Sequence, residues 1–167
     1  MGPCISTTRT LHTNATTLPP CRHNNNTLVI DLHDTLIHET EHAIVQRHGL
    51  KHFLNTTHAH FEIVLYVNKH KHNTHAILQQ LHIQQHWISH ITHENDLTKL
   101  GRSLATTLRI RNHTQPTLQR NHTLRITPFH GQRDSELLHL TRTLTRIAQS
   151  PHHHITDALQ SVMLKKS

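Results

Sequence analysis

Cysteine is nearly absent from this sequence: Cys4 and Cys21 are the only two among 167 residues. Both precede the first apolar run, which excludes a disulfide framework and a cysteine-based zinc site, while a single bridge in the N-terminal part stays open. Aromatic residues supply 3% of the chain and apolar residues 34%, so a core has to rest on leucine and isoleucine. No apolar run reaches the roughly 18–20 residues of a membrane-spanning helix, so we expect no transmembrane segment.

Acidic residues are also scarce, with 10 Asp and Glu against 17 Lys and Arg, a formal net charge of +7. A basic surface suits nucleic acid, anionic lipid or an acidic protein, and composition does not choose among them. Arg120, Arg125, Arg142 and Arg146 are our candidates for a face that binds a partner or RNA. Arg142 and Arg146 are four apart, so they share one side of a helix. The alternative is a merely solvated basic face.

Histidine is abundant, with 23 residues, together with threonine, asparagine, glutamine and leucine. Their codons are poor in guanine, so a base bias of the genome explains the histidines without a function for each. Two clusters, at residues 70–75 and 152–154, have spacings that can hold a metal. Lysines beside the first cluster disfavour a cation there. We interpret both as surface histidines, and expect no metal site and no cofactor.

Residues 1–27 form a distinct N-terminal arm that contains Arg9 and Arg22, many serines and threonines, and no acidic residue. This composition is typical of a mitochondrial transit peptide or an organellar arm, so we predict a mitochondrial location. Such an arm has no periodicity and is disordered alone, so we expect it to lie against a partner.

After the arm, short apolar runs alternate with segments of helical spacing. This alternation predicts one α/β domain over residues 28–167, a three-layer sandwich with a mostly parallel sheet. The near-continuous apolar run Phe61–Val67 fits a strand covered on both faces. The expected strands are residues 28–32, 61–67, 87–91, 107–111 and 124–126; the expected helices lie at 50–54, 75–81, 97–104, 134–149 and 155–164.

The segment Asp31-Leu32-His33-Asp34-Thr35 follows the first strand. It resembles the first motif, Asp-x-Asp-x-Thr, of the haloacid-dehalogenase (HAD) phosphohydrolases, with His33 in place of the second aspartate. Further segments line up in order with the FCP-type branch, the phosphatases of the RNA polymerase II C-terminal domain. These segments are residues 47–54, 61–67 and 96–104, the last leading to residues 110–112.

The C-terminal part is more specific within that branch. Residues 118–121, Thr127-Pro128-Phe129-His130-Gly131, Asp134, Leu137 and residues 155–159 resemble the presequence-receptor subunit of the mitochondrial inner-membrane translocase. That receptor family often lacks the catalytic aspartates. Its extended β-hairpin before the Asp-Leu-x-Lys-Leu element looks deleted here, because Trp87–Glu94 runs almost directly into Asp96.

The resemblance implies positions for a phosphatase site, and most of them carry another residue. The nucleophile position keeps Asp31, and the asparagine of the metal-binding pair is kept as Asn112. Arg111 occupies the position of a magnesium ligand. Its positive charge would repel Mg²⁺, and we expect it to pair with Asp31 instead. The four changed positions are the general acid (His33), the phosphate-binding hydroxyl (Val67), the motif lysine (Asn95) and the magnesium ligand (Arg111).

We therefore interpret the chain as a catalytically inactive, pseudophosphatase-type HAD domain. It would act as a structural or binding subunit of a large mitochondrial assembly: the import translocase, a respiratory complex or the mitochondrial ribosome. Its expected partners are other protein subunits, with RNA if the assembly is ribosomal. One alternative is an active phosphatase that forms an aspartyl phosphate on Asp31 with His33 as the acid. Another is a presequence receptor of the import translocase.

Overall fold

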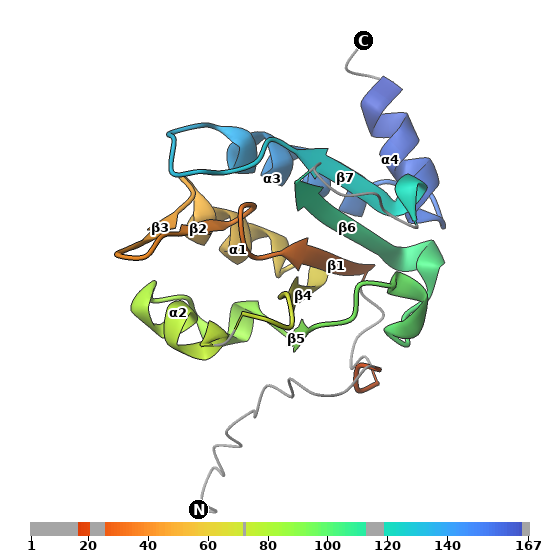
Figure 1. Cartoon of the computed structure of the whole chain (residues 1–167). Helices are drawn as coiled ribbons and strands as arrows, with labels where there is room; N and C mark the ends of the chain where they lie inside the picture. The colour runs from red at the N-terminus through yellow and green to blue at the C-terminus, as the bar shows by residue number, and fades with distance from the viewer. Residues whose placement is uncertain (1–16, 21–25, 72, 113–118, 165–167) are drawn as a thin grey trace, which may run out of the picture.

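The computed structural model describes residues 17–20, 26–71, 73–112 and 119–164. Its centre is a five-stranded sheet in the order β5-β4-β1-β6-β7, in which every neighbouring pair is parallel (Figure 1). The α/β fold with a mostly parallel sheet is thereby confirmed. The strands are β1 (Asn26–Asp31), β4 (Phe61–Tyr66), β5 (His90–Thr92), β6 (Thr107–Asn112) and β7 (Thr123–Ile126).

Strand β1 is central, and its side chains alternate between the two faces of the sheet. Leu28 and Ile30 belong to the large core cluster, whereas Val29 belongs to a second, smaller one. Asp31, the last residue of β1, is on the same side as Val29. The strand therefore divides its residues between a helical core and the face that carries the candidate site.

The large cluster is built with four α-helices: α1 (Leu50–Thr57), α2 (Thr74–Gln80), α3 (Glu136–Ala148) and α4 (Ile155–Leu164). Figure 1 shows α1 and α3 behind the sheet. Helix α3 buries Leu137, Leu140 and Leu144, which are spaced so that they line one face. Helix α1 begins after Gly49, whose φ of 81° is a conformation that glycine adopts without steric cost.

The opposite face has a thinner cover, made of 3₁₀ turns and a short piece of the arm. Leu97 and Leu100 pack with Val29, Val64 and Leu18 in the smaller cluster. The turns are η2 (Leu97–Lys99) and η3 (Leu104–Thr106). The helix expected over residues 97–104 is therefore wrong.

Two local features explain why no α-helix forms there. Gly101 has a φ of +70°, which ends any right-handed turn between η2 and η3. Asp96 and Ser103 each accept a backbone hydrogen bond from the second residue beyond them, Thr98 and Ala105. Each residue thus caps a separate short turn.

Residues 17–20 lie against the domain itself. The backbone N–H of Leu18 donates to the carbonyl of Leu100 at 3.0 Å, and Arg102 Nη2 donates to the carbonyl of Pro19 at 2.7 Å. This part of the arm therefore contacts its own fold, where we had expected a partner. Asn26 and Thr27, which we had placed in the arm, begin β1. Residues 1–16 and 21–25, with Cys4 and Cys21, lie outside the described residues.

Arg102 also anchors a buried acid on the same face. Its Nε and Nη2 donate to the two carboxylate oxygens of Glu62, both at 2.7 Å, and the Thr27 hydroxyl donates to Glu62 at 3.0 Å. His90 Nε2 lies 3.3 Å from the same carboxylate. Although burial would raise it, these partners lower the pKa of Glu62 to about 2.

The strand predicted at residues 87–91 is present as β5, which begins three residues later and has only three residues. A 3₁₀ turn, η1 (Gln85–Trp87), precedes β5, and residues 93–96 alone separate β5 from η2. A further turn, η4 (Arg120–His122), leads into β7. Among the described residues, none of the helices is long and apolar enough to cross a membrane.

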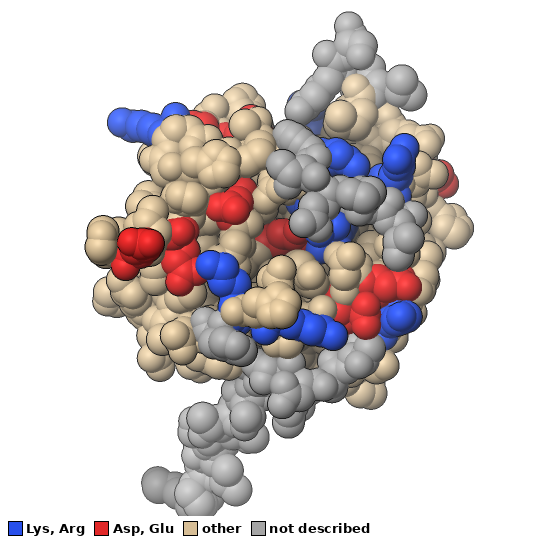
Figure 2. All heavy atoms as spheres, viewed as in Figure 1, with Lys and Arg blue, Asp and Glu red and all other residues tan. Residues whose placement is uncertain are grey.

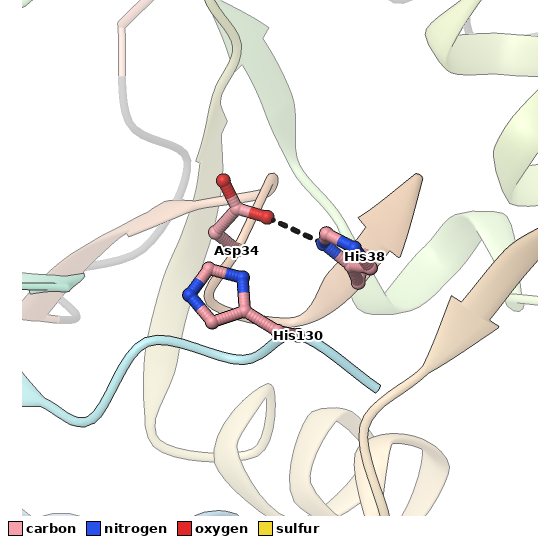
Figure 3. Close-up of side chains that lie close together, drawn as sticks. All are labelled: Asp34, His38 and His130. Carbon is pink, nitrogen blue, oxygen red and sulfur yellow. Dashed lines mark hydrogen bonds and ion pairs between the residues drawn. The ribbon is translucent and has the colours of Figure 1, made fainter. Parts of the chain in front are cut away.

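A small antiparallel hairpin, β2 (Ile37–Glu39) with β3 (Ile44–Gln46), follows β1 and was not expected from the sequence. Asp34 lies in the turn between β1 and β2, with a φ of 53°, and its side chain meets Nδ1 of His38 at 2.8 Å (Figure 3). Figure 2 shows basic and acidic side chains interspersed on the face viewed. That face is not uniformly basic, despite the net charge.

Candidate functional site

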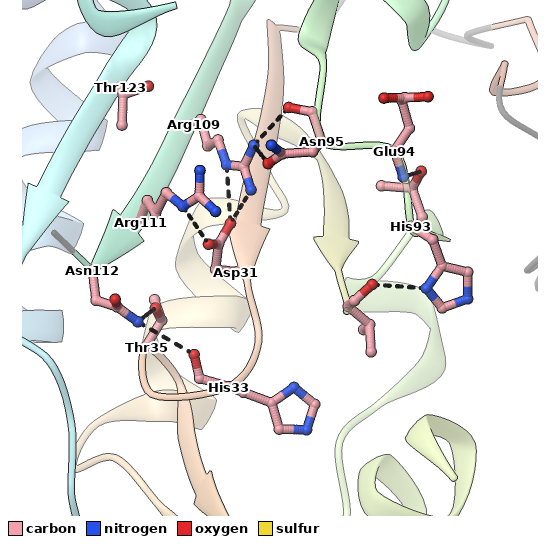
Figure 4. Close-up of polar contacts among 12 residues, drawn as sticks. Asp31, His33, Thr35, His93, Glu94, Asn95, Arg109, Arg111, Asn112 and Thr123 are labelled. Atoms are coloured by element: carbon pink, nitrogen blue, oxygen red, sulfur yellow. Dashed lines mark hydrogen bonds and ion pairs between the residues drawn. The ribbon is translucent and has the colours of Figure 1, made fainter. Parts of the chain in front are cut away.

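The candidate site lies where β1 and its neighbours end. In parallel α/β sheets, ligands bind outside the carboxyl ends of the strands, because the loops that diverge there leave a crevice. Here a cavity of about 290 Å³ is lined by Asp31, His33, Tyr66, Lys71 and Arg111, among others. Figure 4 shows the polar side chains that gather around Asp31.

Two arginines of β6 hold the Asp31 carboxylate. Arg109 donates to Oδ1 through Nε at 2.9 Å and through Nη2 at 2.7 Å. The Nε of Arg111 lies 3.1 Å from Oδ2. Both carboxylate oxygens are therefore engaged by guanidinium groups, and the predicted ion pair between Arg111 and Asp31 is present.

Arg109 is held in turn by Asn95 and Tyr66. Its Nη1 donates to the backbone carbonyl of Asn95 at 2.9 Å and to the Oδ1 of the same residue at 2.8 Å. Its guanidinium carbon lies 4.6 Å from the centre of the Tyr66 ring, a cation–π contact. Asn95 thus joins the site through Arg109 and makes Asp31, Asn95 and the two arginines one network.

Burial sets the electrostatics of this network. Asp31 is 7% exposed and Arg109 is 2% exposed. Burial raises the pKa of Asp31, and the charges and hydrogen bonds of Arg109 and Arg111 oppose that rise. Burial likewise lowers the pKa of Arg109, against the attraction of Asp31. The Asp31 carboxylate and the Arg109 guanidinium can both be buried because each offsets the charge of the other.

His33 lines the same cavity but has a different set of neighbours. Its Nε2 lies 3.4 Å from Oε2 of Glu39, without the direction of a good hydrogen bond. Glu39 in turn accepts from Lys71 Nζ at 2.9 Å. Burial, followed by the charge of Lys71, lowers the pKa of His33. The lowered pKa favours the neutral ring, which is a far weaker acid than imidazolium.

Val67 does not present its side chain to the cavity. It is fully buried in the large core cluster, and its carbonyl is 2.7 Å from Nδ1 of His93. Asn112 faces the turn after β1: its Nδ2 donates to the carbonyl of Asp34 at 3.2 Å and to the hydroxyl of Thr35 at 3.3 Å. These contacts fix the turn that follows Asp31.

A third buried arginine, Arg47, fastens the same turn from the other side. It has no exposed surface, and it donates to the carbonyls of Thr35 and Thr127 at 2.9 Å. It also forms a bidentate pair with Asp134: Nε donates to Oδ1 at 3.1 Å, and Nη2 donates to Oδ2 at 2.8 Å. Its guanidinium lies over the ring of Phe129, 5.4 Å from the centre. Arg47 therefore joins the β1–β2 turn to the loop after β7.

Among the predicted site residues, Asp31, Asn95 and Arg111 belong to one hydrogen-bonded network. His33 lines the same cavity without joining that network. The missed member is Arg109, and the signal was present: residues 109 and 111 are two apart in a strand, so they share a face. Asp31 is on that same face of the sheet, as the parallel register of Val29 with Arg109 requires.

The predicted partner face is spread over three elements. Arg142 and Arg146 are exposed on α3, while Arg120 is in η4 and Arg125 is in β7. The histidines at 152–154 are exposed before α4. His72, in the other histidine cluster, lies outside the described residues.

Comparisons with known proteins agree with this fold. A family model described as NLI interacting factor-like phosphatase matches residues 26–154. Among solved structures, the chain is similar to an RNA polymerase II CTD phosphatase of fission yeast, determined with bound beryllium fluoride. The TM-score is 0.52 at 13% identity, and the match covers 85% of this chain and 56% of that one. At this identity the likeness shows the fold alone. No curated protein matches the sequence.

Proposed function

Because the chain belongs to the family of NLI interacting factor-like phosphatases, we propose that it uses their fold without their chemistry. It is a catalytically inactive HAD-like domain, closest in type to the presequence receptors, and a structural or binding subunit of a mitochondrial assembly.

The contact of Asp31 with Arg109 and Arg111 carries this proposal. An aspartate that attacks phosphorus needs a free carboxylate oxygen with access to the substrate. Here Oδ1 accepts two hydrogen bonds from Arg109, and Oδ2 faces Arg111. Releasing either oxygen would leave a buried guanidinium without its countercharge, which costs several kcal/mol.

The residues around Asp31 do not fit the magnesium ion that the family implies. Mg²⁺ is held by carboxylate and other oxygen ligands. Arg111 stands at the metal-ligand position of the resemblance, and its guanidinium offers no ligand atom; its Nε is 3.1 Å from Asp31. The two guanidinium groups already neutralise the carboxylate charge that would attract the metal.

The other changed positions support the same conclusion. His33 has a lowered pKa and is therefore a poor proton donor at neutral pH. Val67 has no hydroxyl and is buried in the core. Asn95 accepts from Arg109 instead of binding a phosphate as a lysine would.

The assembly role rests on the composition of residues 1–27 and on the exposed arginines of α3. The basic, acid-free arm suits a mitochondrial address. Arg142 and Arg146 give α3 two exposed positive charges one turn apart. The candidate assemblies are the import translocase, a respiratory complex and the mitochondrial ribosome.

Phosphatase activity is the first test. The full chain and its Asp31→Asn variant are incubated with an aryl phosphate and Mg²⁺, and phosphate release is followed. We expect both rates to equal that of buffer. Magnesium-dependent release that Asp31→Asn abolishes would instead establish the alternative, an enzyme with Asp31 as nucleophile and His33 as acid.

Native purification from the source organelle tests the assembly role. We expect the chain to co-migrate with a fixed set of subunits. RNA in that particle would identify a ribosome, and haem or quinone would identify a respiratory complex. Saturable binding of a basic amphipathic peptide by the isolated chain would favour the presequence receptor. A free monomer that binds no such peptide would contradict the subunit role.

A further inference from the structure

Outside the arginine network, the described residues bring one trio of potential metal ligands together. Asp34, His38 and His130 each offer a ligand atom, and these atoms all lie within 4.8 Å of one another. Figure 3 shows the three side chains converging from the turn after β1, from β2 and from the loop after β7. From this geometry we propose a site for a divalent metal such as Zn²⁺, in preference to Mg²⁺ or Ca²⁺, that links the β1–β2 turn to that loop.

The ligand chemistry fits zinc. Two imidazoles and one carboxylate form the kind of three-ligand set that leaves a fourth position open to water. Carboxylate and imidazole ligands together suit Zn²⁺ better than the hard cations Mg²⁺ and Ca²⁺, which prefer oxygen alone. The site opens outward, since His130 is exposed.

The distances require only side-chain adjustment. Ligand atoms on a tetrahedral zinc ion lie about 3.3 Å apart, from metal–ligand bonds of about 2.0–2.1 Å. Asp34 Oδ1 and His38 Nδ1 are 2.8 Å apart and hydrogen-bonded. The ion takes the place of the proton between them, and that proton moves to Nε2, as it must in a neutral imidazole that binds metal through Nδ1. His130 closes the remaining gap by rotating about its side-chain bonds, which its exposed position allows.

The backbone under the trio is held firmly, which lowers the entropy lost on binding. The N–H of Phe129, next to His130, donates to the carbonyl of Asp34 at 2.9 Å. Phe129 is 1% exposed and packs against the guanidinium of Arg47. The backbone N–H of His130 donates to Oε1 of Gln132 at 2.7 Å. The two loops are therefore already joined before any metal binds.

Zinc titration of the purified full chain tests the site. We expect one equivalent to bind tightly and to raise the thermal midpoint. His130→Ala should weaken that equivalent by more than about 100-fold, because loss of a direct ligand exceeds the effect of an outer-shell partner. Asp34→Asn should do the same, and asparagine tolerates the positive φ of this position.

Because the chain has many histidines, the control removes more of them elsewhere. The triple variant His152→Ala, His153→Ala and His154→Ala deletes three exposed histidines and leaves the trio intact. It should keep the tight equivalent and its thermal shift. Without zinc, all variants should melt at the wild-type temperature. The Co²⁺ form should show d–d absorption without a thiolate charge-transfer band.

Three results would overturn the site. They are full zinc binding by His130→Ala, loss of the tight equivalent in the triple variant, and a cobalt–thiolate band that reports a cysteine ligand. Phosphatase activity has no part in this measurement, so the outcome is independent of the proposed function.

Discussion

Arg109 binds one oxygen of Asp31 through two of its nitrogens, Nε at 2.9 Å and Nη2 at 2.7 Å. This leaves Oδ2 to Arg111. One carboxylate thus serves as the countercharge for two arginines of the neighbouring strand. We infer that the main contribution of Asp31 is to the stability of the fold.

Replacing Asp31 by asparagine should therefore destabilise the protein strongly. The side chain keeps its shape but loses its charge, so two buried guanidinium groups lose the Asp31 countercharge, at a cost of about 3–5 kcal/mol. Urea unfolding followed by circular dichroism measures this. Glu41→Gln, at an exposed position, is the control and should change the free energy of unfolding by less than about 0.5 kcal/mol. A stable Asp31→Asn variant would mean that the carboxylate is not needed as a countercharge.

Arg47→Lys should also be costly, although it preserves the charge. A lysine cannot make the bidentate pair with Asp134 and also reach the carbonyls of Thr35 and Thr127. We expect a loss of about 2–4 kcal/mol in the free energy of unfolding. The exposed Arg133 offers the matched control, since Arg133→Lys should unfold like the wild type. Equal stability of the two variants would show that the fork geometry of Arg47 is dispensable.

Glu62 should make the free energy of unfolding fall as the pH is lowered. Its pKa falls from the model-peptide value of 4.5 to about 2 in the folded chain. A carboxyl group with a lowered folded-state pKa contributes its stabilisation above the unfolded-state pKa and loses it as the pH falls toward the folded-state value. Between about pH 5 and 2, the wild type should lose about 3 kcal/mol relative to Glu62→Gln. Parallel pH profiles of the two proteins would contradict the assigned pKa.

On the proposed assembly role, charge reversal on α3 should detach the protein from its partners. Arg142→Glu with Arg146→Glu changes two exposed side chains, so the free energy of unfolding should stay within about 0.5 kcal/mol. We expect the variant to be lost from the native particle, as measured by co-purification of a tagged chain. Lys51→Glu with Lys69→Glu makes the same change of charge at other exposed positions and should remain bound. If both variants co-purify equally, α3 is not the contact.

The sequence predicts the strands of this fold better than the cover on its second face. Continuous apolar runs locate β1 and β4 because both strands are buried on both sides. The leucine spacing of α3 is equally informative. Leu97, Leu100 and Leu104 also have helical spacing, yet Gly101 and the capping residues divide the segment into 3₁₀ turns. Local backbone chemistry there overrides the hydrophobic pattern.

For the site, the sequence predicted the contact of Asp31 with Arg111 but missed Arg109. A resemblance to a known motif located Asp31 and Arg111, and opposite charges made their contact predictable. Arg109 was not among the predicted site residues, since an arginine inside a strand is seldom fully buried. Its burial depends on Asn95 and Tyr66, which come from other segments of the chain, and no spacing within β6 reveals them.

The short contact of residues 17–20 also restricts how this chain can be processed. Gly101 lies so near Thr17 that a Cβ on Gly101 would approach the threonine methyl group to 2.7 Å, and Leu18 fills the cluster over Val29 and Val64. On the proposed mitochondrial address, a peptidase that trims the arm and keeps this contact would cut before Thr17. A chain that lacked Leu18 as well would expose the apolar side chains of Val29 and Val64 that Leu18 packs against.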